Sequence, residues 1–396
     1  MPDPTRPPEA PTAGILTPEE ARPPQGLAAN DLHGFLDRHR ARLVALAGAA
    51  LASIMLPASI GRERIITLNL GMGRDSLAML GLLVEGRLVA EGRVLTPEDI
   101  DAVVFADPGA EWAHTMALLP RVRRFCMRHD LRFLHIQKPS PEAWTRYLAE
   151  LPAPGAPDRR TALSERPWRD AEPATIEEKA ASGWYHLRAP ILDDYQSRAT
   201  IASRSKKDCT ENHKVEPIRK VVSDLSLERF GLDGRGWGVQ VRAGARWPHL
   251  NLIGIAADEA ARALFAHPLL GGSGPWYATE AYPLIEAGIS KADEQPILSR
   301  HGFPDARKSG CYLCPFQPIG WFWALRETDP EGWASVVAYE AAALAENPRM
   351  FLVGKTSIDV AVAAWRARNP AATVEAVLSK DYARACERPA PLDAAA

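Results

Sequence analysis

The chain has 396 residues, of which 46% are hydrophobic and 24% are charged, with a formal net charge of −2. This is the composition of an ordinary globular protein, and it argues against a globally basic nucleic-acid binder. No apolar run approaches the roughly 20 residues of a membrane-spanning helix, so we expect a cytoplasmic protein with no membrane partner. The five cysteines are too few and too scattered for a secreted disulfide framework: Cys126, Cys209, Cys311, Cys314 and Cys386.

Composition divides the chain into four parts. Residues 1–28 are rich in proline and are expected to be a disordered tail, and residues 386–396 to be a second one. Between them we expect an α/β domain over 29–290 and a helical portion over 291–385. Residues at about 139–190 hold many Pro, Arg and Glu residues, which predicts an irregular insertion in the α/β domain.

Strands and helices alternate in the α/β domain. A helix capped by Asn30 comes first. Apolar runs then predict strands at 64–70, 100–107, 131–137 and 249–256. Helical spacing predicts helices between the first three strands, at 75–89 and 111–130. This order predicts right-handed crossovers and a Rossmann-like, doubly wound parallel sheet.

The rest of the chain is predicted to be mainly helical. Residues 193–225 have mostly helical character, with an interruption expected before Pro217. Two further helices are expected around 318–328 and 330–346, after a loop that carries a C-x-x-C motif.

The stretch NLGMGRDS lies between the first strand and its helix. A glycine-rich turn at a helix N-terminus binds anions through unpaired backbone N–H groups and the helix dipole. An aspartate in such a turn either caps the helix or helps to hold Mg²⁺, and a plain capped turn is the alternative. We expect five residues to contact the anion: Gly71, Gly73, Arg74, Asp75 and Ser76.

The cysteines suggest a metal site. Cys209 and the C-x-x-C pair, Cys311 and Cys314, supply three thiolates. On a [4Fe–4S] cluster, three thiolates leave one iron open. Zinc is the alternative, with His213 as fourth ligand, and a reduced set or a redox pair is the third. Cys126 lies in an apolar helix and is expected to be a core residue.

The glycine loop resembles the pyrophosphate loop, S-G-G-x-D-S, of the PP-loop ATP pyrophosphatases. Its second half, Gly73-x-Asp75-Ser76, is intact, while Gly71 and Met72 replace the first Ser and the first Gly. FADPGAEWAHT is similar to the second-strand motif of the sulfonucleotide-reductase branch of these proteins. Asp107 and Gly109 hold the matching positions there, and a doubly wound sheet brings them toward the glycine loop.

Three later segments extend the resemblance over roughly residues 62–345. CTENHKVEP and SGCYLCPF are similar to the two cluster segments of bacterial adenylylsulfate reductases, although Thr210 replaces the second Cys of the first segment. IGIAADEAAR resembles the family's G-I-R-x-D-x-S-x-x-R turn, with Arg262 at a position suited to phosphate. The chain thus resembles the phosphoadenylylsulfate-reductase-like family of PP-loop proteins, which have adenine nucleotide α-hydrolase-like (HUP-type) folds.

The resemblance implies an enzyme that binds ATP and Mg²⁺ and activates an acceptor at the α-phosphate. Asp75 and Lys214 are the expected catalytic residues, and Cys209, Cys311 and Cys314 would hold a [4Fe–4S] cluster for sulfur transfer. The implied partners are an acceptor that is either a small molecule or a nucleic acid, a sulfur-donor protein and further copies of the chain.

Two other functions stay open. One is a sulfonucleotide reductase, which needs a cysteine nucleophile. The family's C-terminal nucleophile segment is absent, and Cys386 alone lies late enough to replace it. The other is a nucleotide sensor without turnover in a multi-protein system, which the changed first half of the loop allows.

Overall fold

The computed structural model describes residues 64–150, 172–202, 208–231, 249–260, 263 and 278–380. Several expectations lie outside these residues: the two tails, the helix after Asn30, Arg262 and Cys386.

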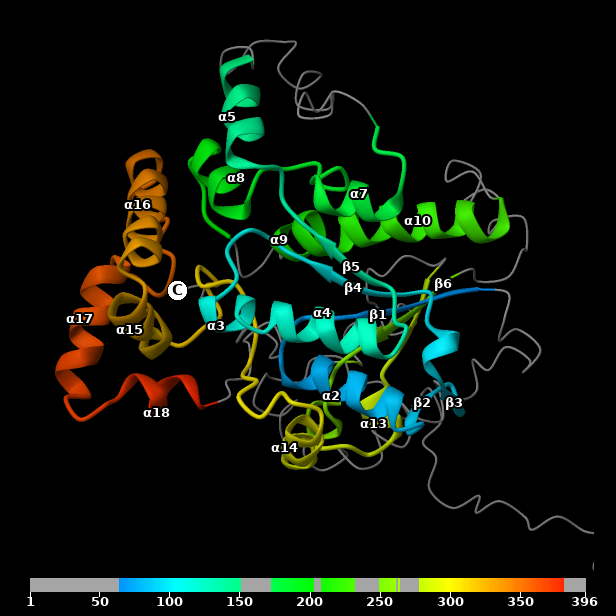
Figure 1. The fold of residues 1–396 in the computed structure, drawn as a ribbon. Helices are drawn as coiled ribbons and strands as arrows, with labels where there is room; N and C mark the ends of the chain where they lie inside the picture. Colours follow the sequence, from blue (N-terminus) through cyan, green and yellow to red (C-terminus); the bar gives the residue numbers. More distant parts are fainter. Residues whose placement is uncertain are drawn as a thin grey trace, which may run out of the picture.

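Five parallel strands form the central sheet, in the order β5-β4-β1-β6-β7 (Figure 1). The strands are β1 (Ile65–Asn69), β4 (Ala102–Ala106), β5 (Phe133–Ile136), β6 (His249–Ile253) and β7 (Ala278–Ala281). The four predicted strands and their parallel arrangement are confirmed, and β7 is an addition. In the register, Thr67 of β1 lies between Ala102 of β4 and Asn251 of β6. From β1 the chain adds β4 and β5 on one side of the sheet and then β6 and β7 on the other side, so the strand order reverses between β1 and β6.

Helices connect and cover the strands. Those of the α/β part are α2 (Arg74–Val84), α3 (Ala113–Met116), α4 (Leu119–Arg128), α5 (Pro141–Glu150), α7 (Ile176–Ala181), α8 (Ile191–Ser197), α9 (Asp208–Thr210), the π-helix η3 (Glu211–Val215), α10 (Glu216–Phe230), α13 (Pro283–Glu286) and α14 (Lys291–Arg300). Short 3-10 turns lie at η2 (Pro97–Asp99) and η4 (Ala257–Glu259).

Several predicted boundaries differ from the structure. The helix expected at 75–89 ends at Val84, because Gly86 adopts a left-handed φ of 65°. The chain then forms a small antiparallel hairpin of β2 (Leu88–Ala90) and β3 (Arg93–Leu95). The segment at about 139–190, expected to be irregular, contains α5 and α7.

Pro217 and Pro120 do not break their helices, because each lies in the first turn. The interruption expected before Pro217 is absent, because Pro217 lies in the first turn of α10 and η3 runs directly into that helix. Pro120 likewise lies in the first turn of α4, where a missing N–H removes no helical hydrogen bond.

Helices cover both faces of the sheet, with α7 and α10 on one side and α2, α4 and α14 on the other (Figure 1). Successive side chains of each strand point to opposite faces of the sheet, so alternate residues pack against the two helix layers. In β1, Ile66 and Leu68 pack toward α2, whereas Ile65 packs toward α10. Because both faces are buried, the strands are nearly continuous apolar runs.

A separate helical region follows the sheet, as expected for the C-terminal portion. It contains α15 (Ile319–Thr328), α16 (Pro330–Glu346), α17 (Ile358–Arg368) and α18 (Val374–Leu378), which share a core with α8. The buried Glu340 carboxylate accepts backbone hydrogen bonds from Leu352 and Ile358, and so ties the α16–α17 connection to α16.

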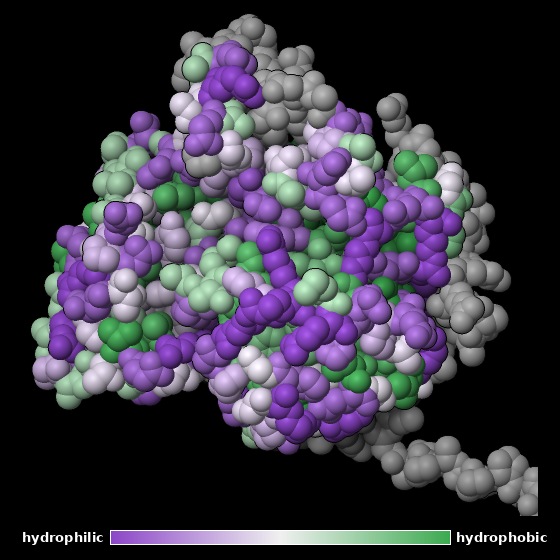
Figure 2. Space-filling view, viewed as in Figure 1, coloured by the Kyte–Doolittle hydropathy of each residue, from purple (hydrophilic) through white to green (hydrophobic). Residues whose placement is uncertain are grey.

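On the face shown in Figure 2, polar side chains cover most of the surface and the apolar areas are small and separate. None of the helices in the described part of the chain is long and apolar enough to cross a membrane.

Candidate functional site

The glycine loop joins β1 to α2 at the carboxyl end of the sheet. Gly73 is the N-cap residue of α2, and its carbonyl oxygen accepts a hydrogen bond from Leu77 N at 3.0 Å. The Ser76 hydroxyl donates to the same carbonyl at 3.0 Å. Ser76 therefore stabilises the first turn with its hydroxyl, while the backbone N–H groups of this turn remain directed toward the helix N-terminus.

Met72 occupies a strained position in this loop. Its φ is 59°, in the left-handed region that normally favours glycine, and its side chain is fully buried in the core beneath α2. Burial of the side chain offsets a backbone cost of about 1 kcal/mol. The loop thus adopts at Met72 a backbone conformation that glycine adopts more readily.

Two close approaches bring the loop against distant segments. A Cβ atom on Gly73 would lie 2.7 Å from the Ser309 hydroxyl and 3.0 Å from the Ser309 backbone nitrogen. A Cβ atom on Gly254, just after β6, would lie 2.9 Å from the backbone nitrogen of Ser76. Glycine at these positions lets the loop meet both the end of β6 and the segment before the C-x-x-C motif.

A cavity of about 300 Å³ opens beside the loop, where the strand order reverses. Such reversals are the usual ligand positions in doubly wound sheets. Its charged and hydroxyl lining residues are Arg74, Asp75, Ser76, Thr210, Lys214, Lys291, Lys308 and Ser309, and its apolar lining includes Val104, Phe105, Val215, Ile218 and Ile253. Four cations and one carboxylate give the cavity a positive lining, which favours an anion.

The prediction of Gly71, Gly73, Arg74, Asp75, Ser76 and Lys214 therefore selected residues that share one cavity. It missed Lys291 and Lys308. Lys308 directly precedes Ser309 of the S-G-C motif, so its position was a usable signal. Lys291 starts α14, and no local pattern marks it as a site residue.

Asp107 and Gly109 have a different setting. Ala106 lines the cavity, whereas the Asp107 carboxylate accepts a hydrogen bond from Gly109 N at 2.7 Å and lies 3.5 Å from His135 Nε2. Gly109 has a left-handed φ of 82°, and a Cβ there would lie 2.9 Å from Pro190. Among the described residues, these two shape the turn after β4 and do not line the cavity.

Lys214 links this cavity to a second one. The second cavity, of about 120 Å³, is lined by Cys209, Cys311 and Cys314 together with Thr210 and Lys214. Thr210 and Lys214 line both cavities. The cavity of the three predicted metal-binding cysteines is thus adjacent to the cavity of the glycine loop, and Thr210 and Lys214 separate the two.

The Lys214 ammonium group donates a hydrogen bond to Glu111 Oε1 at 2.8 Å. The Glu111 side chain is fully buried, and its Oε2 atom has no hydrogen-bond partner among the described residues. Glu111 also pairs with Cys311 through an isolated backbone bridge. A buried carboxylate therefore holds Lys214 in place next to the cysteine segment.

The cysteine cavity fits thiolate ligands in part. No disulfide joins Cys209, Cys311 or Cys314, and the Cys314 N–H donates to the Cys311 carbonyl at 3.1 Å in a tight turn. Burial raises the pKa of the Cys311 thiol, so a thiolate there needs a cation. In the described part of the chain, no three His, Cys, Asp or Glu side chains are grouped so as to hold a metal ion. Neither the three cysteines alone nor the set that adds His213 forms such a group.

His213 instead belongs to a buried hydrogen-bond network. Its Nδ1 atom lies 2.8 Å from Lys138 Nζ, and its Nε2 atom lies 3.2 Å from Asp194 Oδ2. Because an ammonium group only donates, Nδ1 accepts from Lys138 and Nε2 carries the hydrogen toward Asp194. Burial lowers the pKa of Lys138 to about 7 and that of His213 to about 4. The network anchors η3, the π-helix that ends in Lys214 and Val215.

Asp75 faces another carboxyl group, on α14. Glu294 is fully buried, and burial together with the nearby Asp75 raises its pKa to about 9. Arg74 Nε lies 3.5 Å from Glu294 Oε2, and Arg74 Nη2 donates to the Lys291 carbonyl at 2.9 Å. The sequence pattern did not indicate Glu294.

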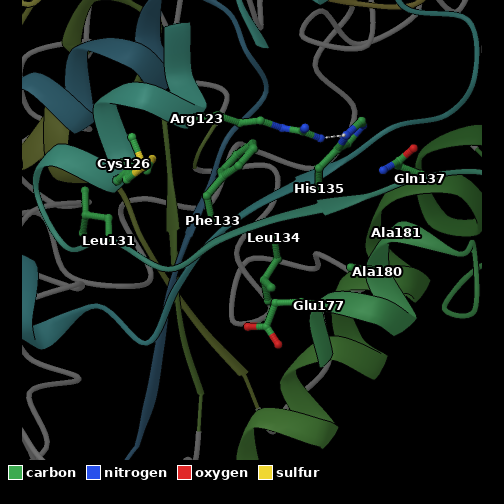
Figure 3. A pocket seen from close by; sticks show the side chains of 11 residues that line it. Arg123, Cys126, Leu131, Phe133, Leu134, His135, Gln137, Glu177, Ala180 and Ala181 are labelled. Atoms are coloured by element: carbon green, nitrogen blue, oxygen red, sulfur yellow. Dashed lines mark hydrogen bonds between the residues drawn. The ribbon is translucent and has the colours of Figure 1, made fainter. Parts of the chain in front are cut away.

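A further hollow, of about 320 Å³, lies along β5 (Figure 3). Cys126 lines it, and burial raises the pKa of this thiol to about 12, which confirms the prediction of a core cysteine. The Arg123 guanidinium points to His135, with 3.2 Å between Nη2 and Nδ1 (Figure 3). None of the predicted site residues lines this hollow, so we place the candidate site at the two cavities that share Lys214.

No protein-family model, curated protein or solved structure matches this chain in the three comparisons made.

Proposed function

We propose that this chain is a PP-loop, phosphoadenylylsulfate-reductase-like enzyme with a HUP-type fold. In this proposal it binds ATP in the cavity beside the glycine loop and activates an acceptor at the α-phosphate, for iron–sulfur-dependent sulfur transfer. The observation that carries the proposal is the shared wall: Thr210 and Lys214 line both the cationic cavity and the cysteine cavity.

The phosphate end of ATP suits the polar part of the larger cavity. Backbone N–H groups at the start of α2 and the ammonium groups of Lys214, Lys291 and Lys308 supply donors and positive charge. The apolar residues Val215, Ile218 and Ile253 suit the nucleoside end. When an acceptor oxygen attacks the α-phosphorus, the bond to the pyrophosphate oxygen breaks, and these cations stabilise the departing charge.

The cysteine cavity would hold the cluster, since three cysteines line it and thiolates are the usual ligands of an iron–sulfur cluster. Cys209, Cys311 and Cys314 would hold it, and a cluster bound by three thiolates supplies one open iron for a sulfur ligand. The ammonium group of Lys214, which Glu111 holds in place, would lie between this cluster and the nucleotide phosphates.

The nucleotide half of the proposal is tested by ATP binding to the full chain. Lys214→Ala should weaken ATP binding by about tenfold to a hundredfold, since a charge-assisted hydrogen bond contributes about 1.5–3 kcal/mol. Lys220→Ala is the matched control, because Lys220 lies on the next turn of the same helical segment and pairs with Glu216. Isothermal titration calorimetry measures both. Equal affinities of the two variants, or a wild-type chain that does not bind ATP, contradict this half.

The metal half is tested by anaerobic purification. The wild-type protein should be coloured and hold about four iron and four sulfide ions per chain. Cys311→Ser should lower both contents and the visible absorption. Cys126→Ser should change neither, because Cys126 lines the separate hollow along β5. A colourless protein that contains zinc, or equal iron in both variants, would overturn the cluster.

A further inference from the structure

The hollow along β5 lies where a further strand of the sheet would lie. β5 is an end strand, and among the described residues it pairs with β4 alone. Arg123 and Met127 of α4 line the hollow on one side, and Glu177 and Ala181 of α7 line it on the other (Figure 3). These two helices cover opposite faces of the sheet, and both reach its edge. The hollow of about 320 Å³ between them therefore continues the plane of the sheet.

Backbone groups of β5 point into this hollow. Alternate residues of a strand direct their N–H and C=O groups to opposite sides. The carbonyl groups of Arg132 and Ile136 accept hydrogen bonds from Val103 N and Asp107 N, on the β4 side. The backbone groups of Phe133 and His135 therefore point the other way, toward the edge. Both residues line the hollow, so a chain that enters it meets their N–H and C=O groups.

The edge of β5 is open to pairing. Strand edges in proteins are usually blocked by a lysine or a proline or covered by another segment. β5 has the sequence FLHI, which contains neither a lysine nor a proline. Met127 exposes 72% of its surface at the same hollow and offers an apolar contact. An edge of this kind suits an extended peptide, which adds to the sheet as a strand through main-chain hydrogen bonds.

The charge beside the hollow favours an acidic peptide. Arg123 lines the hollow, and the exposed Arg124 and Arg128 lie on the adjacent surface of the same helix. In the described part of the chain, none of these three arginines is paired with a carboxylate. Across the hollow, Glu177 is already paired with Arg132, at 2.7 Å between Oε1 and Nε. The α4 side is thus positively charged, and the α7 side offers mainly small alanine side chains.

We propose that the hollow along β5 is a docking site for an extended, acidic segment of a partner protein, which adds a strand to the edge of the sheet. Successive side chains of such a strand point to opposite faces. Acidic side chains then meet Arg123 on α4, and apolar ones pack against Ala180 and Ala181 on α7. The expected sequence of the segment alternates acidic and apolar residues. The hollow shares no lining residue with the two cavities that share Lys214, so this inference does not rest on the proposed function.

A fluorescent octapeptide that alternates Glu and Val is the probe, and fluorescence anisotropy measures its binding to the full chain. Ala181→Phe should weaken binding by at least about tenfold, because the ring fills part of the hollow. Ala181 is exposed at the end of α7, so the fold should be retained, which thermal unfolding checks. Arg123→Gln should weaken binding by about tenfold, because it removes a charge-assisted hydrogen bond.

Arg121→Gln is the matched control. Arg121 lies on the same helix and the substitution removes the same charge, but its guanidinium is paired with Asp305 and does not line the hollow. Peptide affinity should stay within about twofold of the wild-type value. An equal loss in Arg121→Gln and Arg123→Gln, or a wild-type chain that does not bind the peptide, would overturn the proposal.

N-methylation of the peptide separates strand addition from simple attraction between charges. One version is methylated at the amides of its Glu residues and a second at the amides of its Val residues. In an added strand only one of these two sets faces β5. One version should therefore lose at least about tenfold in affinity, while the other should bind like the parent peptide. Equal effects of the two methylations would contradict strand addition.

Other occupants of the hollow give different results. If a second copy of the chain binds there, the wild-type protein should sediment as a dimer and Ala181→Phe as a monomer. If the arginines of α4 instead bind a nucleic-acid backbone, a labelled oligothymidylate should bind more tightly than the peptide, and Arg123→Gln should weaken it. Either result would mean that the proposal is wrong.

Discussion

Gly254→Ala should separate the end of β6 from the glycine loop. A Cβ atom there would lie 2.9 Å from Ser76 N and 3.0 Å from Asp75 C, and both are backbone atoms that cannot rotate away. Overpacking of this kind costs about 1–3 kcal/mol in unfolding free energy. Because the displaced atoms form the first turn of α2, ATP affinity should fall even under conditions in which the variant remains fully folded. Chemical denaturation and calorimetric titration measure the two effects.

Gly71→Ala is the control for this substitution. It lies in the same loop, but its nearest neighbour would be the Ser309 hydroxyl at 3.4 Å, an ordinary van der Waals contact. We expect a change in unfolding free energy below about 1 kcal/mol, within the usual range for a substitution that creates no clash. If Gly254→Ala is as stable as Gly71→Ala and binds ATP as tightly as the wild-type protein does, the close contact between β6 and α2 is not required.

Acidification should destabilise the protein through its buried histidines. Burial, aided by the nearby Arg64, lowers the pKa of His249 to about 3, and burial lowers those of His213 and His186 as well. In the unfolded chain these groups take up protons near pH 6.5, whereas the folded chain keeps them neutral. The unfolded state therefore gains protons first as the pH falls, and each histidine lowers stability by about 1.4 kcal/mol per pH unit below 6.5.

His249→Gln isolates one of these contributions. Glutamine can keep the hydrogen bond that His249 Nε2 makes with Thr67 Oγ1 at 2.8 Å, but it does not titrate. The difference in unfolding free energy between the variant and the wild type should grow by about 1.4 kcal/mol per unit between pH 6 and pH 4. Glu294 shifts stability in the opposite sense, since the folded state holds its proton up to about pH 9, and this cancels in the difference. A difference that stays constant with pH would contradict the assignment.

The α/β class followed from the sequence because its strands are continuous apolar runs. RIITLNL and the runs that became β4, β5 and β6 alternate with helical periodicity, and that order alone implies a parallel sheet. The boundaries were less certain, since they depend on single residues such as Gly86. β7 escaped notice because four residues, ATEA, carry no β pattern, and the sheet edge formed by β6 stabilises them as a strand.

The candidate site divides in the same way. The sequence indicated Gly71, Gly73, Asp75 and the C-x-x-C pair. A glycine turn at a helix start and two closely spaced thiols can each be recognised within a few consecutive residues. The partners Lys291, Lys308, Glu111 and Glu294 depend on contacts between segments that lie far apart in the chain. Glu111 and Lys214 are 103 positions apart, and no local pattern connects them.

The sequence by itself determined four strands of the sheet, the glycine-rich turn and the three thiols, because each is encoded in neighbouring residues. Only the tertiary structure decided that the two cavities share Lys214 and that Glu294 meets Asp75. The physical reason is packing: Gly73 and Gly254 lack side chains, so the glycine loop closes onto Ser309 and the end of β6, while the helix that carries Glu294 packs against α2.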